Sequence, residues 1–319
     1  MVYSVAKLLK DSRECFTSMS LFRVSRRVAS VCALAYVCAT CAFSQEPDQT
    51  KKQNADEPQA QKEKAKDRQT PSSSAGEDTQ QDEITAVPNR PTFASTAETV
   101  ERGVFEVEYG FELASAHQNI NGLLKWGAFK NLELWFLNIP IERDSGVAGR
   151  GDCGAGFKYR IISESRKLPT TSILYVATLP TATAQLGSGA LGHSVQLLVS
   201  KDFGKHHFDA NEGLQLVGRQ GASRYDRNYF TALSYSHAIA GKWGWTGELA
   251  GYSWTNANNP ATMTLLGAGT FNMTSRLVLD GGAYLAIYGN LPRITFFSGV
   301  TYSVANLYHL HSSRHAAKH

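Results

Sequence analysis

Apolar and polar residues alternate along much of the chain after Asn89. In the stretch VFEVEYGFEL, residues 104–113, five apolar or aromatic side chains alternate with three glutamates and one glycine. A period of two predicts a β-strand with one dry face and one wet face. The question that this stretch raises is whether the dry face meets a protein core or lipid.

Strand-like segments follow one another to the end of the chain, and no stretch after Asn89 has a convincing helical period. Most are about ten residues long, whereas strands of soluble proteins average about five or six. A tilted strand that spans a membrane needs about nine to eleven residues. The predicted strands are 104–113, 119–128, 130–139, 151–162, 170–179, 191–202, 206–217, 227–238, 242–254, 262–271, 275–287 and 292–304.

The connections between these segments alternate in length. Tight turns follow the second, sixth, eighth and tenth strands, at 130–131, 203–205, 240–242 and 272–275. Longer connections follow the odd-numbered strands, at 114–118, 140–150, 180–190, 218–226, 255–261 and 288–291, and 163–169 is an intermediate exception. Bacterial outer-membrane barrels have short periplasmic turns, long external loops and an even number of strands. The pattern therefore predicts that both ends of the barrel region lie in the periplasm.

The apolar faces carry aromatic residues near the strand ends, which is typical of the girdles at the two membrane surfaces. These are Trp126, Trp243, Trp245, Trp254 and Tyr302. A soluble β-sandwich also alternates, but strand length and loop alternation favour a closed barrel, in which lipid meets no unpaired backbone group. We predict an all-β fold in residues 89–308: a transmembrane, antiparallel, up-and-down β-barrel of about 12 strands in the bacterial outer membrane.

Two features do not fit this pattern well. Glu212 falls in phase with Leu214 and Leu216 on the apolar face, so we expect either a bulge in that strand or a position near the membrane surface. The last strand is followed by ANLYHLHSSRHAAKH, and it either ends near Val304 or continues to Tyr308 or Leu310. Residues 309–319 are predicted to be a flexible tail.

The first 88 residues have a different composition. Three arginines precede an apolar run at 28–43, and small residues precede Gln45, so residues 1–44 are predicted to be a secretory signal peptide. Met19 lies at the usual distance for its start, which would leave 1–18 outside the protein; the alternative is an uncleaved inner-membrane anchor. Residues 45–88 are rich in Gln, Lys, Glu, Asp and Ser without an aromatic residue, which predicts a disordered linker.

Charge and cysteine content exclude several classes of function. Of the 32 Lys and Arg and the 28 Asp and Glu, six and two lie in residues 1–44, which leaves 26 of each in the remainder. The net charge of +4 therefore belongs to the signal peptide and does not indicate a nucleic-acid partner. Four of the five cysteines also lie there, and Cys153 alone remains, so neither a disulfide scaffold nor a paired-cysteine zinc site is expected. We expect no cofactor and no metal.

Four stretches resemble, in order, a known family. They are NRPTFASTAETVERGVFEVEYGFEL, GLLKWGAFKNLELWF, GRGDCGAGFKYRI and ILYVATLPTA, which together cover roughly residues 90–182. In this order they resemble the outer-membrane β-barrel transporter family named for the meta-pathway of phenol degradation. The resemblance implies a Gram-negative outer-membrane barrel that passes small, often aromatic or hydrophobic compounds without a cofactor or a catalytic residue. The long C-terminal extension departs from such barrels, which usually end on a terminal aromatic residue.

The alternation predicts which charged side chains face the lumen. These candidate lining residues are Glu106, Glu108, Glu112, Asp152, Lys158, Arg160, Glu248 and Asp280. They either form a selectivity lining for charged solutes or fill the lumen as a salt-bridge network, since about twelve strands lie between small filled barrels and wide porins.

The predicted function is that of a channel or transporter for small solutes, and the protein is not expected to be an enzyme. Membrane lipid, the solute and the outer-membrane assembly machinery are the expected partners. The main alternative is a non-conducting structural or adhesion barrel. A lipid hydrolase is a weaker alternative, because the candidate neighbours His193 and Ser194, and Ser236 and His237, point to opposite faces of their strands.

Overall fold

The computed structural model describes residues 84–253 and 261–308. The chain divides into two units, 1–76 and 77–319, and every described residue belongs to the second. The predicted signal peptide, most of the predicted linker, Trp254 and the predicted tail at 309–319 lie outside the described residues.

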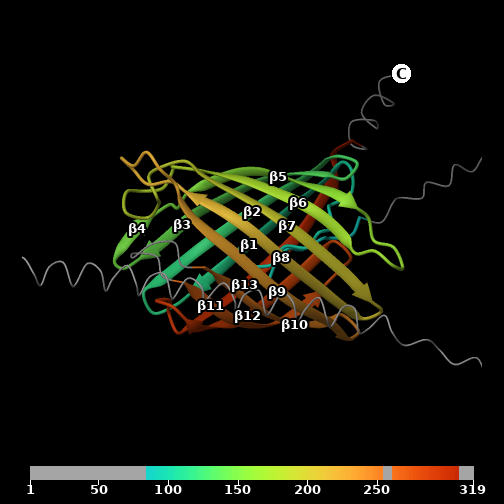
Figure 1. Cartoon of the computed structure of the whole chain (residues 1–319). Coiled ribbons are helices and arrows are strands. Elements are labelled where there is room, and N and C mark those ends of the chain that lie inside the picture. Colours follow the sequence, from blue (N-terminus) through green and yellow to red (C-terminus); the bar gives the residue numbers. More distant parts are fainter. Residues whose placement is uncertain (1–83, 254–260, 309–319) are drawn as a thin grey trace, which may run out of the picture. The chain divides into compact units, whose positions relative to one another are not determined.

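The described residues form one closed antiparallel barrel (Figure 1). Its strands are β1 (Val104–Leu113), β2 (His117–Phe129), β3 (Leu132–Asp144), β5 (Cys153–Ile162), β6 (Thr170–Leu179), β7 (Gly192–Phe203), β8 (His206–Val217), β9 (Asp226–Ala240), β10 (Trp243–Tyr252), β11 (Thr262–Asn272), β12 (Leu277–Tyr288) and β13 (Ile294–Asn306). A short strand, β4 (Val147–Gly149), only extends the hairpin of β3. Pairing of β1 with both β2 and β13 closes the sheet, so the predicted twelve-stranded barrel is confirmed.

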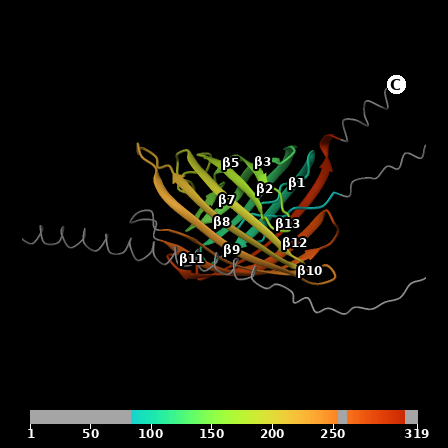
Figure 2. The same cartoon turned by 45° about the vertical axis from the view of Figure 1, so that its right-hand side comes forward.

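Consecutive strands lie side by side, and the turned view of Figure 2 shows the same order. Within the two described ranges, no helix is long and apolar enough to span a membrane.

The two ends of the barrel differ in their connections. We call one the turn end, because it carries the tight turns at 130–131, 204–205, 241–242 and 273–276 together with 163–169. Gly204 and Gly241 adopt φ values of 64° and 57° there, a left-handed conformation that tight hairpin turns require and glycine allows. The other, the loop end, carries 114–116, 145–152, 180–191, 218–225 and 289–293, together with Ser253 and Ala261 at the two ends of the β10–β11 connection. Val104 and Asn306 both lie at the turn end, which is the periplasmic end by the rule for such barrels.

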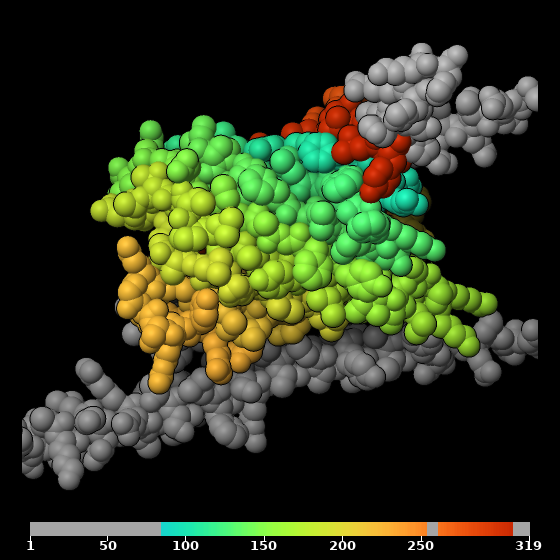
Figure 3. Space-filling model, turned by 90° about the horizontal axis from the view of Figure 1, so that it is seen from above, coloured from blue at the N-terminus to red at the C-terminus, as the bar shows by residue number. Residues whose placement is uncertain are grey.

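Burial in this barrel is the reverse of burial in a soluble protein. The largest fully buried side chains include Lys125, Lys158 and Glu106, whereas Phe296 and Trp243 are 60% and 59% exposed. The exposed apolar side chains come from every part of the wall, and Figure 3 shows one such face, on which successive strands lie next to one another from green to orange. Only lipid can cover so much apolar surface, so the exterior is that of a membrane-spanning barrel.

The predicted girdle residues also lie on this exterior. Trp243, Trp245 and Tyr302 are exposed near the turn end, and Trp126 packs there against Tyr308 with ring centroids 6.0 Å apart.

Glu212 corrects one expectation. The pairing of β8 with β7 and β9 is regular, so the strand has no bulge, and Glu212 is the seventh of its twelve residues, far from both ends. Its side chain is exposed on the apolar face, where it accepts a hydrogen bond of 2.7 Å from the hydroxyl of Thr231 on β9. This bond gives one carboxylate oxygen a partner that lipid cannot supply.

The last strand continues beyond the predicted Val304 to Asn306 and stops short of Tyr308. The side chain of Tyr308 instead donates a hydrogen bond to the carbonyl oxygen of Ala128 at 2.6 Å, which holds the residues just after β13 against β2.

The exterior assignment gives a test by substitution. Leu265 lies within β11 and is exposed on the outer face of the barrel, whereas Met273 is exposed in the turn that follows β11. We expect Leu265→Arg to lower the free energy of unfolding in lipid vesicles by about 2–4 kcal/mol, and Met273→Arg by about 0–1 kcal/mol. Urea titration followed by tryptophan fluorescence measures both, and equal effects would contradict a lipid-covered exterior.

Candidate functional site: the lumenal segment

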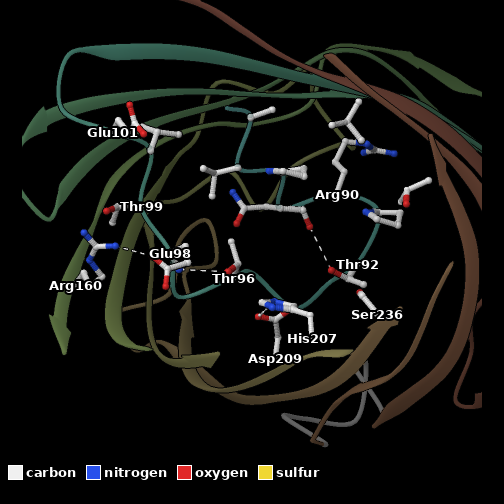
Figure 4. Close-up of a pocket in the computed structure, with 18 of the residues that line it drawn as sticks. Arg90, Thr92, Thr96, Glu98, Thr99, Glu101, Arg160, His207, Asp209 and Ser236 are labelled. Atoms are coloured by element: carbon white, nitrogen blue, oxygen red, sulfur yellow. Dashed lines mark hydrogen bonds and ion pairs between the residues drawn. The ribbon is translucent and has the colours of Figure 1, made fainter. Parts of the chain in front are cut away.

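Residues 84–100 cross the interior of the barrel, and residues 101–103 lead from it into β1 at the turn end. We call residues 84–103 the lumenal segment. Figure 4 shows this segment curving across the lumen within the ring of strands. It enters at the turn end, where the amide of Ala86 donates to the carbonyl of Ser275, and it returns to the turn end to begin β1. Residues 84–88, which were expected to belong to the linker, are therefore part of the barrel interior.

Backbone amides of the lumenal segment bind glutamates of the wall. The amide of Val87 donates to Glu106 at 2.9 Å, and the amides of Asn89 and Arg90 donate to the two oxygens of Glu108 at 3.0 and 3.1 Å. These bonds use the backbone of the segment, so they depend on its path more than on its side chains.

Glutamates on two other strands, β10 and β3, hold the segment in the same way. The amides of Phe93 and Ala94 donate to the two oxygens of Glu248 at 2.9 and 2.7 Å, and that of Val100 donates to Glu133 at 2.7 Å. Hydrogen bonds to a charged acceptor are stronger than neutral ones, so four buried carboxylates fix both halves of the segment.

Two buried lysines complete this network. Lys125 lies 2.5 Å from Glu106 and 2.5 Å from Glu108, and it donates to the carbonyl of Val87. Lys158 lies 3.4 Å from Glu133 and donates to the carbonyl of Thr96 at 3.1 Å. Each lysine therefore joins a wall carboxylate to the lumenal segment, and the charges are paired rather than open to a solute.

Polar side chains at the turn end hold the last part of the segment. Glu98 forms an ion pair of 2.6 Å with Arg160 and accepts a hydrogen bond from Thr170. The hydroxyl of Ser172 donates to the carbonyl of Ala97 at 2.5 Å, and the amide of Ala97 donates to Ser200 at 2.7 Å.

Apolar contacts fill much of the remaining lumen. Ala97 packs with Trp135, Leu174, Val176 and Leu198 on one wall. On the other wall, Ala94 packs with Phe230, Ala232 and Ala250, and the ring of Phe93 lies 5.2 Å from that of Tyr284. The lumen at this level is a packed core and not an open pore.

A polar cavity remains beside the segment at the turn end. It has a volume of about 720 Å³. Its lining includes Arg160, His207, Asp209, Ser236 and Thr246 together with residues of the lumenal segment (Figure 4). His207 lies between two carboxylates, 2.6 Å from Asp202 and 3.0 Å from Asp209.

The structure brings most of the predicted lining residues to the lumenal segment. Glu106, Glu108, Lys158, Arg160, Glu248 and Asp280 all contact it. Glu112 instead binds Asn121 and Tyr284. Asp152, just before β5, accepts hydrogen bonds from the amides of Thr181 and Ala182 in the β6–β7 connection, so it joins two connections at the loop end.

Sequence reasoning missed Lys125, Glu133 and the segment itself. The first two could have been found, because Lys125 stands between Leu124 and Trp126, and Glu133 between Leu132 and Leu134, in the same two-residue period. The segment gives no such signal, since it has no alternation.

The two pairs considered for hydrolysis have other partners. His193 stacks on Tyr175, whose hydroxyl is 2.9 Å from its Nδ1, and the hydroxyl of Ser236 lies 2.8 Å from that of Thr246. Neither arrangement pairs a serine with a histidine.

Comparisons with known proteins agree with the fold. The COG4313 outer membrane channel from Pseudomonas putida F1 matches 67% of this chain and 100% of its own length, at 14% identity and a TM-score of 0.51. The NanC porin matches 63% of this chain and 100% of its own, at 11% identity and a TM-score of 0.49. The CymD monoaromatic hydrocarbon channel matches 65% and 90%, at 9% identity and a TM-score of 0.39. No protein-family model and no curated protein matches the sequence.

The structural similarity to the COG4313 channel, at 14% sequence identity, shows the fold, which is a closed outer-membrane β-barrel. Together with the apolar exterior, this fold places the protein in the bacterial outer membrane, in contact with its lipid.

The buried lysines make a test of the network. Lys125→Met would leave Glu106 and Glu108 buried without their cation, so we expect a loss of about 3–5 kcal/mol in the free energy of unfolding. Lys130→Met, in an exposed turn, is the matched control and should change stability by less than about 0.5 kcal/mol. Equal stability of the two variants in lipid vesicles would show that the network does not hold the interior together.

Proposed function

We propose that this protein is an outer-membrane channel for small solutes. In the conformation described above, the lumenal segment closes this channel. The observation that carries the proposal is that the segment adds no strand to the wall. All twelve strands of the barrel pair with each other, so the segment can leave its place without breaking a hydrogen bond between strands.

The bonds that hold the segment favour reversible movement. They are mainly hydrogen bonds from amides to carboxylates and ion pairs, and water can replace each of them once it enters the lumen. The polar cavity beside the segment gives water a place to enter from the turn end. Displacement would then convert a packed interior into a polar pore.

The class of solute follows in part from the family resemblance. That resemblance implies small, often aromatic or hydrophobic compounds, and Phe93, Tyr252 and Tyr284 supply aromatic surface on the loop side of the segment. The machinery that assembles outer-membrane barrels is a further expected partner.

One set of observations favours a second function. The packed apolar clusters and the ion pairs of Lys125 and Lys158 would also suit a barrel that never conducts and serves a structural or adhesion role. The two functions differ in whether the segment moves, which a reversible crosslink can decide.

Thr96 and Ser200 offer a position for this crosslink, because their hydroxyl oxygens are 3.3 Å apart. In a Cys153→Ser background, we expect the Thr96→Cys, Ser200→Cys protein to form a disulfide that fixes the segment to β7. Single-channel recording in planar bilayers should then show openings in the reduced protein and a loss of at least about tenfold in open probability after oxidation.

A second disulfide controls for crosslinking itself. Ser236 and Thr246 face each other on β9 and β10 with hydroxyls 2.8 Å apart, so Ser236→Cys, Thr246→Cys ties two strands together and leaves the segment free. This control should open equally in both redox states. Silence of the wild-type and reduced proteins at every voltage would contradict a channel and favour the non-conducting barrel.

A further inference from the structure

The side chain of Arg90 leaves the lumenal segment and lies on the barrel wall (Figure 4). Beneath it, four residues form a row across four neighbouring strands: Asn121 on β2 pairs with Gly110 on β1, which pairs with Gly299 on β13, which pairs with Asp280 on β12. The row thus has an amide at one end, a carboxylate at the other and two glycines between them. We call this row the cradle.

The polar atoms of the cradle match those of a guanidinium group. Nε and Nη2 of Arg90 donate to the two oxygens of Asp280 at 3.3 and 3.4 Å, and Nη1 donates to the side-chain oxygen of Asn121 at 3.0 Å. Nη2 also donates to the carbonyl oxygen of Ser298 at 3.4 Å. A planar group with several fixed donors suits this two-ended arrangement, whereas a point charge would satisfy only part of it.

The two glycines leave the space that the planar group occupies. A methyl group added at Gly110 would lie 2.1 Å from Cζ of Arg90, and one added at Gly299 would lie 2.2 Å from its Nε. Neither glycine has a positive φ, so an alanine would suit the backbone, and the three atoms nearest to its methyl group would all belong to the guanidinium end of Arg90. The floor of the cradle is therefore shaped for a flat cation.

Charge around the lumen favours the same class of ligand. Among the described residues of the strands, seven carboxylates face the interior against three permanent cations, Lys125, Lys158 and Arg160. The carboxylates are Glu106, Glu108, Glu112, Glu133, Asp209, Glu248 and Asp280. His207 lies between Asp202 and Asp209, and Glu142 adds a further carboxylate near the loop end. A wall with this excess attracts cations and repels anions when the segment no longer covers it.

We propose that the cradle is a binding site for small solutes that carry a guanidinium group, and that Arg90 occupies this site whenever the lumenal segment is in place. The segment and the solute then compete for Asp280 and Asn121. The transport part of this inference rests on the proposed channel function, and the binding part does not.

Vacating the cradle tests the binding part directly. In the full-length Arg90→Ala protein in lipid nanodiscs, methylguanidinium should bind saturably, with an affinity at least about tenfold higher than for the wild-type protein, whose cradle is filled. Isothermal titration calorimetry measures both. Methylammonium, which has the charge but not the planar fork, should bind at least about tenfold more weakly than methylguanidinium.

Two further variants test whether the shape of the cradle matters. Adding Gly299→Ala to Arg90→Ala should abolish binding, because the methyl group occupies the floor. Adding Gly267→Ala, at an exterior glycine with open space around it, should leave binding unchanged. Equal binding by the wild-type and Arg90→Ala proteins, or no effect of Gly299→Ala, would overturn the cradle as a binding site.

Bilayer recording tests the transport part. During wild-type openings, methylguanidinium should be more permeant than chloride, and Asp280→Asn should lower its permeability relative to potassium by about threefold or more. Glu212→Gln removes an exterior carboxylate and should leave this ratio unchanged. If channels open and the permeability ratio of methylguanidinium to potassium is the same in Asp280→Asn as in the wild type, the assignment of the solute is overturned. If no channels open, the channel function is overturned, and the calorimetry alone decides whether the cradle is a binding site.

Discussion

Backbone hydrogen bonding in a medium without water is the constraint on which this structure depends. Lipid offers no partner to an amide or a carbonyl group, so a sheet that spans a membrane has to close on itself. The pairing of β1 with β13 makes that closure. Closure in turn divides every strand into an outer face that lipid covers and an inner face that must satisfy its own polar groups.

The inner face solves this second problem with backbone from the same chain. Its glutamates would be costly to bury alone, and the lumenal segment supplies amide donors at the positions where they stand. Because the bonds use the backbone, most side chains of the segment need only be small. In FASTAET, residues 93–99, five of the six residues after the phenylalanine are Ala, Ser or Thr.

The fold could be predicted from the sequence because its signals are local. Alternation gave the bounds of β1, β6 and β8 to the residue, and the order of short and long connections indicated antiparallel closure. Where prediction was incomplete the cause was also local: the hairpin extension β4 has three residues, and β13 runs two residues further than expected. Glu212 was noticed as an exception, but its partner Thr231 is 19 residues away and cannot be found from periodicity.

The candidate site could be predicted only in part. Alternation identified charged residues such as Glu106, Glu248 and Asp280, yet it could not say what they bind. Phe93 and Glu248 are 155 positions apart, and Arg90 and Asp280 are 190 apart, so their contacts arise only from closure of the barrel. The lumenal segment itself has no period, because its path follows the wall and not a regular element.

Hydrogen exchange of the full-length protein in lipid nanodiscs tests the central claim most directly, namely that wall carboxylates hold residues 84–103 within the barrel. The amides of Val87, Asn89, Phe93, Ala94 and Val100 should exchange at least about a hundredfold more slowly than the same residues in an unstructured peptide. Exchange of all five at the rate of the free peptide, in a protein whose strand amides remain protected, would contradict the account.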